Sequence, residues 1–366
     1  MKLNKSFILF IALLAINFCF TSCGKKESDK KITVAALMRN DSKGTFDQAY
    51  LDALIEEAEN MNVELVVYTS NYDGAIQMDQ LKGLLSQGIR YFVFFPVDTS
   101  LTEQLAKLIA SCDGAAAFSN IIPSLEALKV SKKIFYASSP ETLAGEYQSQ
   151  ILDEYFTRHP DKAPGKVLKI LYIDGEYGHQ GQIYRRKGLL DGLAAKGYTV
   201  NMVREDTANW SYETARQIMD NWLLNDRLLY SKNEFNVVVC QNDEMALGAV
   251  SSLFDNGYVD DPRSPTNDVD GDGTVLRVPV VGIDATAKGS QSMTEKKLYA
   301  TVWQDVKTQA ATALELVVAC AKDGTAEGLV TKNGIRAATA VSQEPPITDK
   351  SILDQCYPVP FVPVTR

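Results

Sequence analysis

Short apolar segments alternate with longer amphipathic segments along most of this chain, and this alternation constrains the possible fold more than any other feature. The first half repeats the unit three times, with strand-like and helix-like segments in turn at residues 32–37, 46–60, 63–68, 75–87, 91–95 and 101–111. A strand, a helix and another strand at this spacing predict a parallel sheet covered by helices on both faces. The apolar character of the strand-like segments fits, because a strand covered on both faces has no solvent side.

A second series of the same kind begins near residue 167. Its segments lie at residues 167–173, 181–196, 198–203, 211–225, 235–240, 243–256 and 278–283. So many strands favour two sheets over one, which predicts an α/β protein with two similar doubly wound parallel-sheet lobes. No Pro/Gly-rich linker separates the series, so we expect a multi-strand hinge.

We expect the chain to cross between the lobes near residues 118–120, 301–304 and 340. The N-terminal lobe would then contain residues 32–118 plus about 304–340. The C-terminal lobe would contain residues 119–303 plus about 341–366.

The N-terminus has the features of an export signal. Two lysines precede an apolar run over residues 7–20, which is shorter than the ~20 residues that cross a bilayer. The sequence Thr-Ser-Cys-Gly, with its cysteine at Cys23, follows this run and resembles the lipobox of bacterial lipoproteins. Ordinary signal cleavage beside an incidental cysteine is the alternative. We expect a signal peptide over residues 1–22, lipidation of Cys23, and a polar tether over residues 23–31. The protein would then be exported and lipid-anchored, facing outward from the cytoplasm.

Charge and motif content narrow the classes of function. The formal net charge is −9, and losing the two lysines of the signal peptide makes it −11. An acidic exported protein is a poor candidate for binding nucleic acid or anionic membranes. His179, Asp243 and Asp284 could perform acid–base chemistry, as paired carboxylates do in glycosidases. However, no nucleophile elbow, metal–histidine cluster or phosphate loop is present, which favours a binding protein with no catalytic residues, and we expect a monomer.

An acidic insertion occupies residues 261–274. Asp268, Asp270 and Asp272 stand at every second position before Gly273, as in the first half of an EF-hand calcium loop. The second half is absent, since Pro279 stands where the loop would end in glutamate, so a further ligand would have to come from elsewhere. A structural Ca²⁺ site and a solvated acidic loop are both open interpretations, and no cofactor is otherwise required.

Five segments occur in the order and spacing of a known family: GEYGH with the following Arg185, DTANW, NDEMALGAV, VVGIDA and ATVWQD. From Ile32 to about Gly324, the chain resembles the periplasmic galactose/glucose-binding proteins and their ribose-binding relatives. These are substrate-binding subunits of sugar ABC importers with the type I periplasmic binding protein fold. The resemblance implies two lobes joined by three strands, a monosaccharide in the cleft, and delivery to the permease subunits by cleft closure.

The resemblance also implies which residues bind the sugar. Phe46 and Trp210 stand where the family places rings against the two faces of the sugar. The matching polar positions, whose side chains would bind hydroxyl groups, are His179, Arg185, Asn242, Asp284 and Gln304. Asp98 resembles a position used by ribose binders, although a helix cap explains it equally well, and Asp243 is expected to cap the helix that follows it.

Three polar positions of the galactose binders are absent from this chain. Gly181 replaces a carboxylate after the histidine, Gly44-Thr45 replaces an acid before the first aromatic, and Phe95-Pro96 replaces an asparagine. Each hydroxyl left unpaired in a buried site would cost about 1–3 kcal/mol. A galactose- or glucose-like ligand therefore competes with a pentose, a deoxysugar or a nucleoside. A sensor subunit for a chemoreceptor or histidine kinase would have the same fold, and the sequence does not separate sensing from transport.

Overall fold

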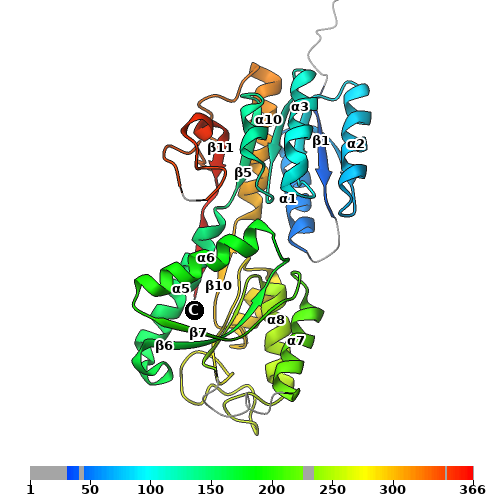
Figure 1. The fold of residues 1–366 in the computed structure, drawn as a ribbon. Coiled ribbons are helices and arrows are strands. Elements are labelled where there is room, and N and C mark those ends of the chain that lie inside the picture. The colour runs from blue at the N-terminus through cyan, green and yellow to red at the C-terminus, as the bar shows by residue number, and fades with distance from the viewer. Residues whose placement is uncertain (1–30, 41–44, 226–234, 343, 366) are drawn as a thin grey trace, which may run out of the picture. The chain divides into compact units, whose positions relative to one another are not determined.

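The computed structural model describes residues 31–40, 45–225, 235–342 and 344–365 (Figure 1). The expected signal peptide, Cys23 and almost all of the expected tether lie outside the described residues. Residues Ile32–Arg366 form one compact unit, which contains both lobes. None of the helices within the described ranges combines the length and the apolar character needed to cross a bilayer.

The N-terminal lobe is built on a six-stranded sheet of order β11-β5-β4-β3-β1-β2, in which every neighbouring pair is parallel. The strands are β1 (Thr33–Met38), β2 (Glu64–Thr69), β3 (Tyr91–Phe94), β4 (Ala115–Phe118), β5 (Ile134–Ser138) and β11 (Cys356–Pro358). The helices are α1 (Phe46–Asn60), α2 (Gly74–Ser86), α3 (Thr102–Ser111), α4 (Leu125–Lys129) and α10 (Val306–Asp323), with the short 3-10 helices η1 (Thr99–Leu101) and η5 (Lys350–Gln355).

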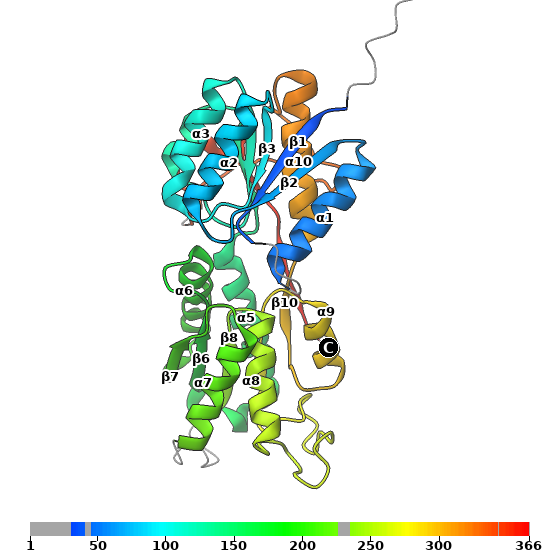
Figure 2. The ribbon, with the colours of Figure 1, turned by 90° about the vertical axis from the view of Figure 1, so that its right-hand side faces the viewer.

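Alternate residues of the N-terminal-lobe strands face two separate hydrophobic cores. On β1, Val34, Ala36 and Met38 pack with α1 and α10, whereas Ala35 and Leu37 pack with α2, α3 and α4. Figure 2 shows α1 and α10 on one side of this sheet and α2 and α3 on the other. Both faces of β1 are therefore buried, which explains why its sequence is apolar at successive positions.

The C-terminal lobe has a parallel sheet of order β7-β6-β8-β9 and a separate antiparallel pair, β10-β12, which isolated parallel bridges connect to the region of β9. The strands are β6 (Val167–Asp174), β7 (Thr199–Thr207), β8 (Val237–Cys240), β9 (Val280–Val281), β10 (Thr301–Gln304) and β12 (Phe361–Val364). The helices are α5 (Glu141–Arg158), α6 (Gln180–Ala195), α7 (Tyr212–Asn225), α8 (Asp243–Asp255) and α9 (Ala287–Thr294), with the 3-10 helices η2 (Pro160–Lys162) and η3 (Pro164–Lys166). The predicted class, an α/β fold with two parallel-sheet lobes, is confirmed.

The chain crosses between the lobes at different places from two of the three expected ones. Because β5 pairs with β4, residues 119–138 belong to the N-terminal lobe, and the first crossing follows Ser138 instead of Phe118. Because β11 pairs with β5 and β12 pairs with β10, the last crossing lies between Pro358 and Phe361 instead of near residue 340. The remaining crossing follows β10, which belongs to the C-terminal lobe, and leads into α10.

The expected lobe boundaries are therefore corrected to residues 32–138 plus 305–358 for the N-terminal lobe and 141–304 plus 361–364 for the C-terminal lobe. The physical reason lies in β4, whose sequence Ala-Ala-Ala-Phe contains no β-branched residue. Such a segment has a weak strand signal, so the additional strand–helix–strand unit that ends in β5 is missed.

Candidate functional site

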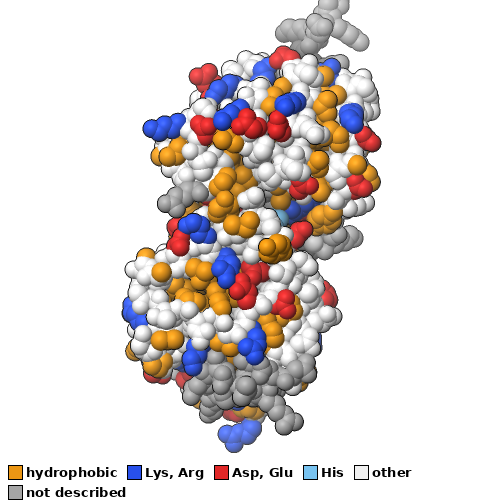
Figure 3. Space-filling view, viewed as in Figure 1, with side chains coloured by type: hydrophobic (Ala, Val, Ile, Leu, Met, Phe, Trp, Pro, Cys, Tyr) orange, Lys and Arg blue, Asp and Glu red, His pale blue; other side chains and the backbone are white. Residues whose placement is uncertain are grey.

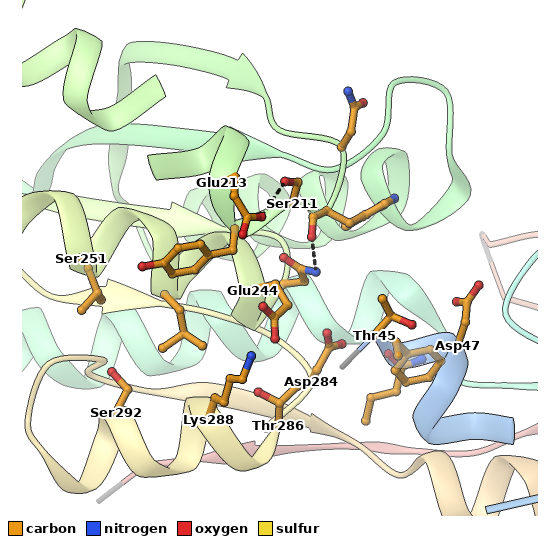
Figure 4. Close-up of a pocket in the computed structure, with 18 of the residues that line it drawn as sticks. Thr45, Asp47, Ser211, Glu213, Glu244, Ser251, Asp284, Thr286, Lys288 and Ser292 are labelled. Carbon is orange, nitrogen blue, oxygen red and sulfur yellow. Dashed lines mark hydrogen bonds between the residues drawn. The ribbon is translucent and has the colours of Figure 1, made fainter. Parts of the chain in front are cut away.

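Loops from both lobes surround one cavity of about 1000 Å³ (Figure 4). The N-terminal lobe contributes Arg39 after β1, Phe46 at the start of α1, Tyr72 after β2 and Asn120 after β4. The C-terminal lobe contributes residues that follow β6, β7, β8 and β9 or end β10. The carboxyl ends of parallel strands meet at one edge of a sheet, which is where ligands bind open α/β sheets. In the space-filling view, charged side chains of both signs and a histidine gather where the lobes meet (Figure 3).

Seven of the eight predicted ligand-binding residues line this cavity: Phe46, His179, Arg185, Trp210, Asn242, Asp284 and Gln304. Asp98 does not line it. Its carboxylate caps η1, accepting hydrogen bonds from the Ser100 backbone N–H at 2.7 Å and from the Ser100 hydroxyl at 2.5 Å. The structure thus favours the helix-cap interpretation for Asp98, and the binding role of the other seven stays a prediction.

The two predicted stacking rings come from different lobes. Phe46 is half-buried and stacks against Phe95 with 6.3 Å between ring centroids. Trp210 lies directly on Gly175, where a Cβ atom would overlap the indole ring. The edge of His179 meets the Trp210 ring at 5.0 Å, and the Trp210 Nε1 is buried with no hydrogen-bond partner in the described structure. Both rings are therefore held by packing before any ligand arrives.

His179 is a neutral imidazole with a defined tautomer. Burial, with Arg39 and Arg185 nearby, holds its pKa well below the usual value. Its Nδ1 accepts a hydrogen bond from the Gly181 backbone N–H at 2.9 Å, so the proton must be on Nε2. The Arg39 Nη1 lies 3.4 Å from that Nε2, and both atoms are donors. An acceptor oxygen of a ligand can therefore receive hydrogen bonds from both lobes at this point.

Arg185 organises the polar floor of the cavity. Its Nε donates to the Glu141 carboxylate at 2.6 Å, its Nη1 to the Gln241 carbonyl at 2.5 Å, and its Nη2 to the Gln304 Oε1 at 3.2 Å. The Gln304 Nε2 is buried without a hydrogen-bond partner in the described residues. Burial raises the pKa of the Asp284 carboxyl well above its usual value, while Arg185, at 4.0 Å, opposes that rise. Gln304 and Asp284 thus retain a donor and acceptors for a ligand.

Asn242, which lines the cavity as predicted, also has a structural role, and Asp243 has a different role from the one expected. Asn242 is the residue that caps α8, because its Oδ1 accepts from the Met245 backbone N–H at 2.9 Å. Asp243 is instead buried and accepts from the Thr286 backbone N–H at 2.7 Å and the Thr301 hydroxyl at 2.6 Å. The expectation that Asp243 caps α8 is therefore wrong. Asp243 is one position too deep for the cap and instead ties α8 to the start of α9 and to β10.

A buried ion pair in the N-terminal lobe was not predicted from sequence. Arg39, directly after β1, donates to both oxygens of Asp47 in the first turn of α1, at 2.8 and 3.0 Å. The sequence feature that could have indicated Arg39 is its position at the carboxyl end of a predicted strand, where ligands bind such sheets. Other charged residues of the cavity that sequence reasoning did not single out are Glu213, Glu244, Asp255, Lys288, Glu295 and Lys297.

The acidic insertion forms a compact cluster. Asp268, Asp270 and Asp272 lie together with Asp260, with one oxygen of each within 4.8 Å of the others. Such a cluster could hold a metal ion, since carboxylate oxygens suit hard divalent cations. Sequence reasoning missed Asp260, which follows α8 and stands eight residues before Asp268.

Two lysines also contact this cluster. The Lys162 ammonium lies 2.8 Å from Asp270 and also contacts Asp272, while the Lys296 ammonium lies 2.9 Å from Asp268. The side chain of Asp268 is only 5 % exposed, and its Oδ1 is buried with no hydrogen-bond partner in the described structure. The lysines therefore do not satisfy every carboxylate oxygen of the cluster.

The fold and the cavity together define a class, that of two-lobed α/β proteins which hold a ligand between the carboxyl-edge loops of their two sheets. Residues 34–326 match the family described as "Periplasmic binding protein domain". The chain belongs to this family, and the resemblance recognised in the sequence is confirmed at that level. Since the family consists of binding proteins, the protein is a binder and not an enzyme.

Several curated relatives match a similar share of the chain. The D-galactose/methyl-galactoside binding periplasmic protein MglB of Haemophilus influenzae is 24% identical over 69% of this chain and 71% of its own length. A putative rhizopine-binding protein of Rhizobium meliloti is 29% identical over 71% of this chain and 75% of its own length. The xylitol-binding protein of Mycolicibacterium smegmatis is 27% identical over 72% of this chain and 66% of its own length.

Solved structures share the fold. An ABC transporter solute binding protein from Bacillus halodurans with bound myo-inositol has a TM-score of 0.68 and 23% identity, covering 92% of this chain and 96% of that one. A periplasmic solute binding protein from Actinobacillus succinogenes with bound D-allose has a TM-score of 0.69 and 18% identity, covering 92% and 98%.

Proposed function

We propose that this protein is an extracytoplasmic sugar-binding protein that captures a monosaccharide, galactose- or glucose-like, and delivers it to an ABC importer. One observation carries the proposal. Residues matched to the sugar-binding positions of the family lie far apart in the sequence, yet seven of them line one cavity between the two lobes. The relatives named for galactose, xylitol and ribose support a ligand rich in hydroxyl groups.

The geometry of the cavity suits a sugar ring that is bound by closure. Phe46 and Trp210 offer apolar faces from opposite lobes, while the rim carries amide, guanidinium and carboxylate groups. The donors on Arg39 and His179 come from different lobes and converge within 3.4 Å. A ligand oxygen placed between them gains both hydrogen bonds only when the lobes are together, so ligand binding favours the closed state.

Calorimetric titration of residues 25–366, which contain the whole compact unit, tests this function. D-galactose, D-glucose, D-xylose and D-ribose are the ligands, with tryptophan fluorescence followed in parallel. We expect micromolar or tighter binding of at least one of them, with a change in emission that disappears in Trp210→Phe and persists in the control Trp222→Phe. If none of the four sugars binds, the monosaccharide assignment is wrong, although the family assignment stands.

A sensor subunit could have the same fold. Delivery of the sugar to an importer is therefore tested separately from sugar binding. A chemoreceptor or sensor kinase as partner would leave sugar binding intact without uptake. Loss of sugar uptake in cells lacking this protein, restored by the wild-type chain, is the result expected for transport. Unchanged uptake together with a lost tactic or transcriptional response would favour the sensor.

We propose that Cys23 carries the lipid anchor of the exported protein. Cys23 follows an apolar segment and a small residue and precedes a polar stretch, which supports lipidation. Labelling of cells with a radioactive fatty acid should mark the wild-type protein but not Cys23→Ser. Equal labelling of both chains, or of neither, would contradict the proposal.

We also propose that the acidic cluster holds a structural calcium ion. The donors are all oxygen, as Ca²⁺ prefers, and Asp260 supplies an acid that the missing second half of the loop would otherwise provide. The unpartnered Asp268 Oδ1 supports a cation there. Because Lys162 contacts two of these carboxylates, a bound ion would displace its ammonium group.

Thermal unfolding in EDTA and in excess CaCl₂ tests the calcium proposal. A free-ion concentration about 100 times the Kd stabilises the folded state by about 2.7 kcal/mol, which raises the melting temperature measurably. Asp268→Asn should abolish this shift, whereas Asp261→Asn, in the same insertion but outside the cluster, should retain it. If Ca²⁺ does not change the melting temperature, the calcium proposal is wrong and the lysines neutralise the cluster.

A further inference from the structure

The wall of the cavity that belongs to the C-terminal lobe carries more negative than positive charge among the described residues. Some charged groups of the cavity are already paired: Arg39 with Asp47, Lys297 with Glu295, and Asp255 with Arg216. After these pairs are set aside, the carboxylates of Glu213, Glu244 and Asp284 and the cations Lys288 and Arg185 remain. Figure 4 shows Glu213, Glu244 and Asp284 following one another across this wall, with Lys288 approaching from below.

The Arg185 guanidinium cannot neutralise Asp284 fully, because it already serves another carboxylate. Glu141 is fully buried and binds the Arg185 Nε at 2.6 Å, whereas Asp284 lies 4.0 Å from the Nη1. The Asp284 side chain is only 8 % exposed, and no described residue donates a hydrogen bond to its carboxylate. A buried carboxylate without donors is costly unless a ligand supplies them.

Glu244 and Glu213 add to the excess of negative charge on this wall of the cavity. Neither carboxylate has an ion-pair partner within the described residues, and Glu244, at the start of α8, is half-buried in the cavity wall. Burial raises the pKa of Glu244, Lys288 opposes the rise, and Glu213 adds to it. The exposed Lys288 ammonium therefore acts on Glu244, which also feels the Glu213 charge, and Asp284 feels the Glu244 charge in turn.

A hydroxyl group of the same cavity wall is also left without a partner. Ser292 lines the cavity and is 7 % exposed, and its Oγ has no hydrogen-bond partner in the described structure. All these groups lie in one lobe, so the charge excess does not depend on how far the cleft is open. A neutral sugar would leave the carboxylates with only hydroxyl donors.

We propose that the natural ligand carries a protonated amine on its polyol ring, as an amino sugar or an aminocyclitol does, with the ammonium held by Asp284, Glu244 and Glu213. This inference rests on the proposed sugar-binding function and narrows it to one chemical class. An ammonium group donates three hydrogen bonds, and charge-assisted hydrogen bonds are stronger than neutral ones. The carboxylates would then be neutralised by the ligand instead of by the protein.

The test compares matched ligands by calorimetry on residues 25–366 at about pH 6, where the amine is protonated. The probes are D-galactosamine, D-glucosamine and 6-amino-6-deoxy-D-glucose, each against the neutral parent hexose, with the N-acetylated 2-amino sugars as uncharged controls of similar shape. We expect at least one amine to bind about tenfold tighter than its parent or more, and N-acetylation to remove that advantage.

Substitutions connect the preference to the proposed residues. Glu244→Gln and Glu213→Gln keep the size of the side chain and should lower the ratio of amine to parent affinity by about tenfold when combined. Glu295→Gln removes the same charge from the same cavity, but from a carboxylate already paired with Lys297 at 2.9 Å, and should leave the ratio as it was.

The outcomes separate the two proposals. Binding of a neutral hexose with no gain for any amine would overturn the inference and leave the sugar-binding function standing. An amine preference that survives in the combined variant would also overturn it, because the charge would then lie elsewhere. Failure of every amine and every neutral sugar to bind would remove both proposals together.

Discussion

Arg185 and Arg186 are adjacent on α6 and have opposite environments. The side chains of Arg185 and Glu141 are 6 % and 1 % exposed, whereas those of Arg186 and Glu205 are 32 % and 35 % exposed. A buried ion pair that loses one partner leaves an uncompensated charge in a medium of low polarity. A surface pair that loses one partner returns the other charge to water.

We expect Arg185→Met to lower the free energy of unfolding by about 3–5 kcal/mol, because Glu141 then remains buried without its partner. Arg186→Met should cost at most about 1 kcal/mol. Urea unfolding followed by circular dichroism measures both. The double variant Arg185→Met/Glu141→Gln should recover part of the loss, and similar costs for the two single variants would contradict this account.

At the residue scale, the sequence could predict the site residues that stand at the ends of strands. Asp284 and Trp210 follow strands, and the alternation of elements predicts where strands end, while the resemblance picks out which residues matter there. Glu141 could not be predicted, since it begins a helix and acts through Arg185, 44 positions away. Such partnerships depend on how helices cross, which no local pattern in the sequence encodes.

At the scale of elements, α5 and α6 cross with their backbones in close contact. A Cβ atom at Gly145 would overlap the carbonyl oxygen of Arg185, and one at Gly188 would overlap the carbonyl oxygen of Thr142. These two glycines let α6 approach α5 closely enough for the side chain of Arg185 to reach Glu141. The close crossing of α5 and α6 therefore supports the polar floor of the cavity.

Gly145→Ala should destabilise the protein, because the new methyl group collides with backbone that cannot move aside. Alanine is favoured over glycine in a helix by about 1 kcal/mol, but overpacking costs about 1–3 kcal/mol or more. Gly83→Ala, in α2, is the control, since a Cβ there meets no atom within 4 Å. Thermal unfolding should show a lower melting temperature for the first variant and an equal or higher one for the second. A stabilised Gly145→Ala would refute the close crossing.

Most helices and strands could be predicted because their boundaries have local causes. Residues 46–60 were predicted as a helix and form α1, whose start is fixed by the side chain of Thr45 accepting a hydrogen bond from the Gln48 backbone N–H. Strand β4 was missed because its alanines carry little strand preference. That single omission displaced the expected first crossing between the lobes by one strand–helix–strand unit.

At the scale of the whole molecule, stability depends on buried acids that prefer to be protonated. Burial raises the pKa of Asp243 and of Glu344 to about 7 in each case. The folded protein therefore binds protons that the unfolded chain releases at the same pH. This contribution is complete below the unfolded pKa values and is lost as the pH rises through the folded ones.

We expect the free energy of unfolding to fall between about pH 5 and pH 8, with one unit of pKa shift worth about 1.4 kcal/mol. Glu344 accepts the backbone N–H groups of Glu141 and Thr142 at 2.7 and 2.8 Å, so Glu344→Gln keeps an acceptor but cannot titrate. The decline should be shallower in this variant.

Asp349→Asn is the control for this measurement. Hydrogen bonds from Ser351 and Lys129 lower the pKa of Asp349 to about 2, so its contribution is present above the unfolded pKa and is lost only as the pH falls through about 2. Urea titrations at a series of pH values should give this variant the same slope as the wild type between pH 5 and pH 8. A wild-type stability that rises over this range would contradict the assignment.

The last strands of the chain have a consequence for how the molecule is made. β11 forms the edge of the N-terminal-lobe sheet beside β5, and β12, with Phe361 almost fully buried, pairs with β10 in the C-terminal lobe. A chain that emerges N-terminus first therefore cannot finish either lobe until residues 356–364 have emerged. Both lobes thus depend on one short segment for their completion, although most of the N-terminal lobe precedes it by more than 200 residues.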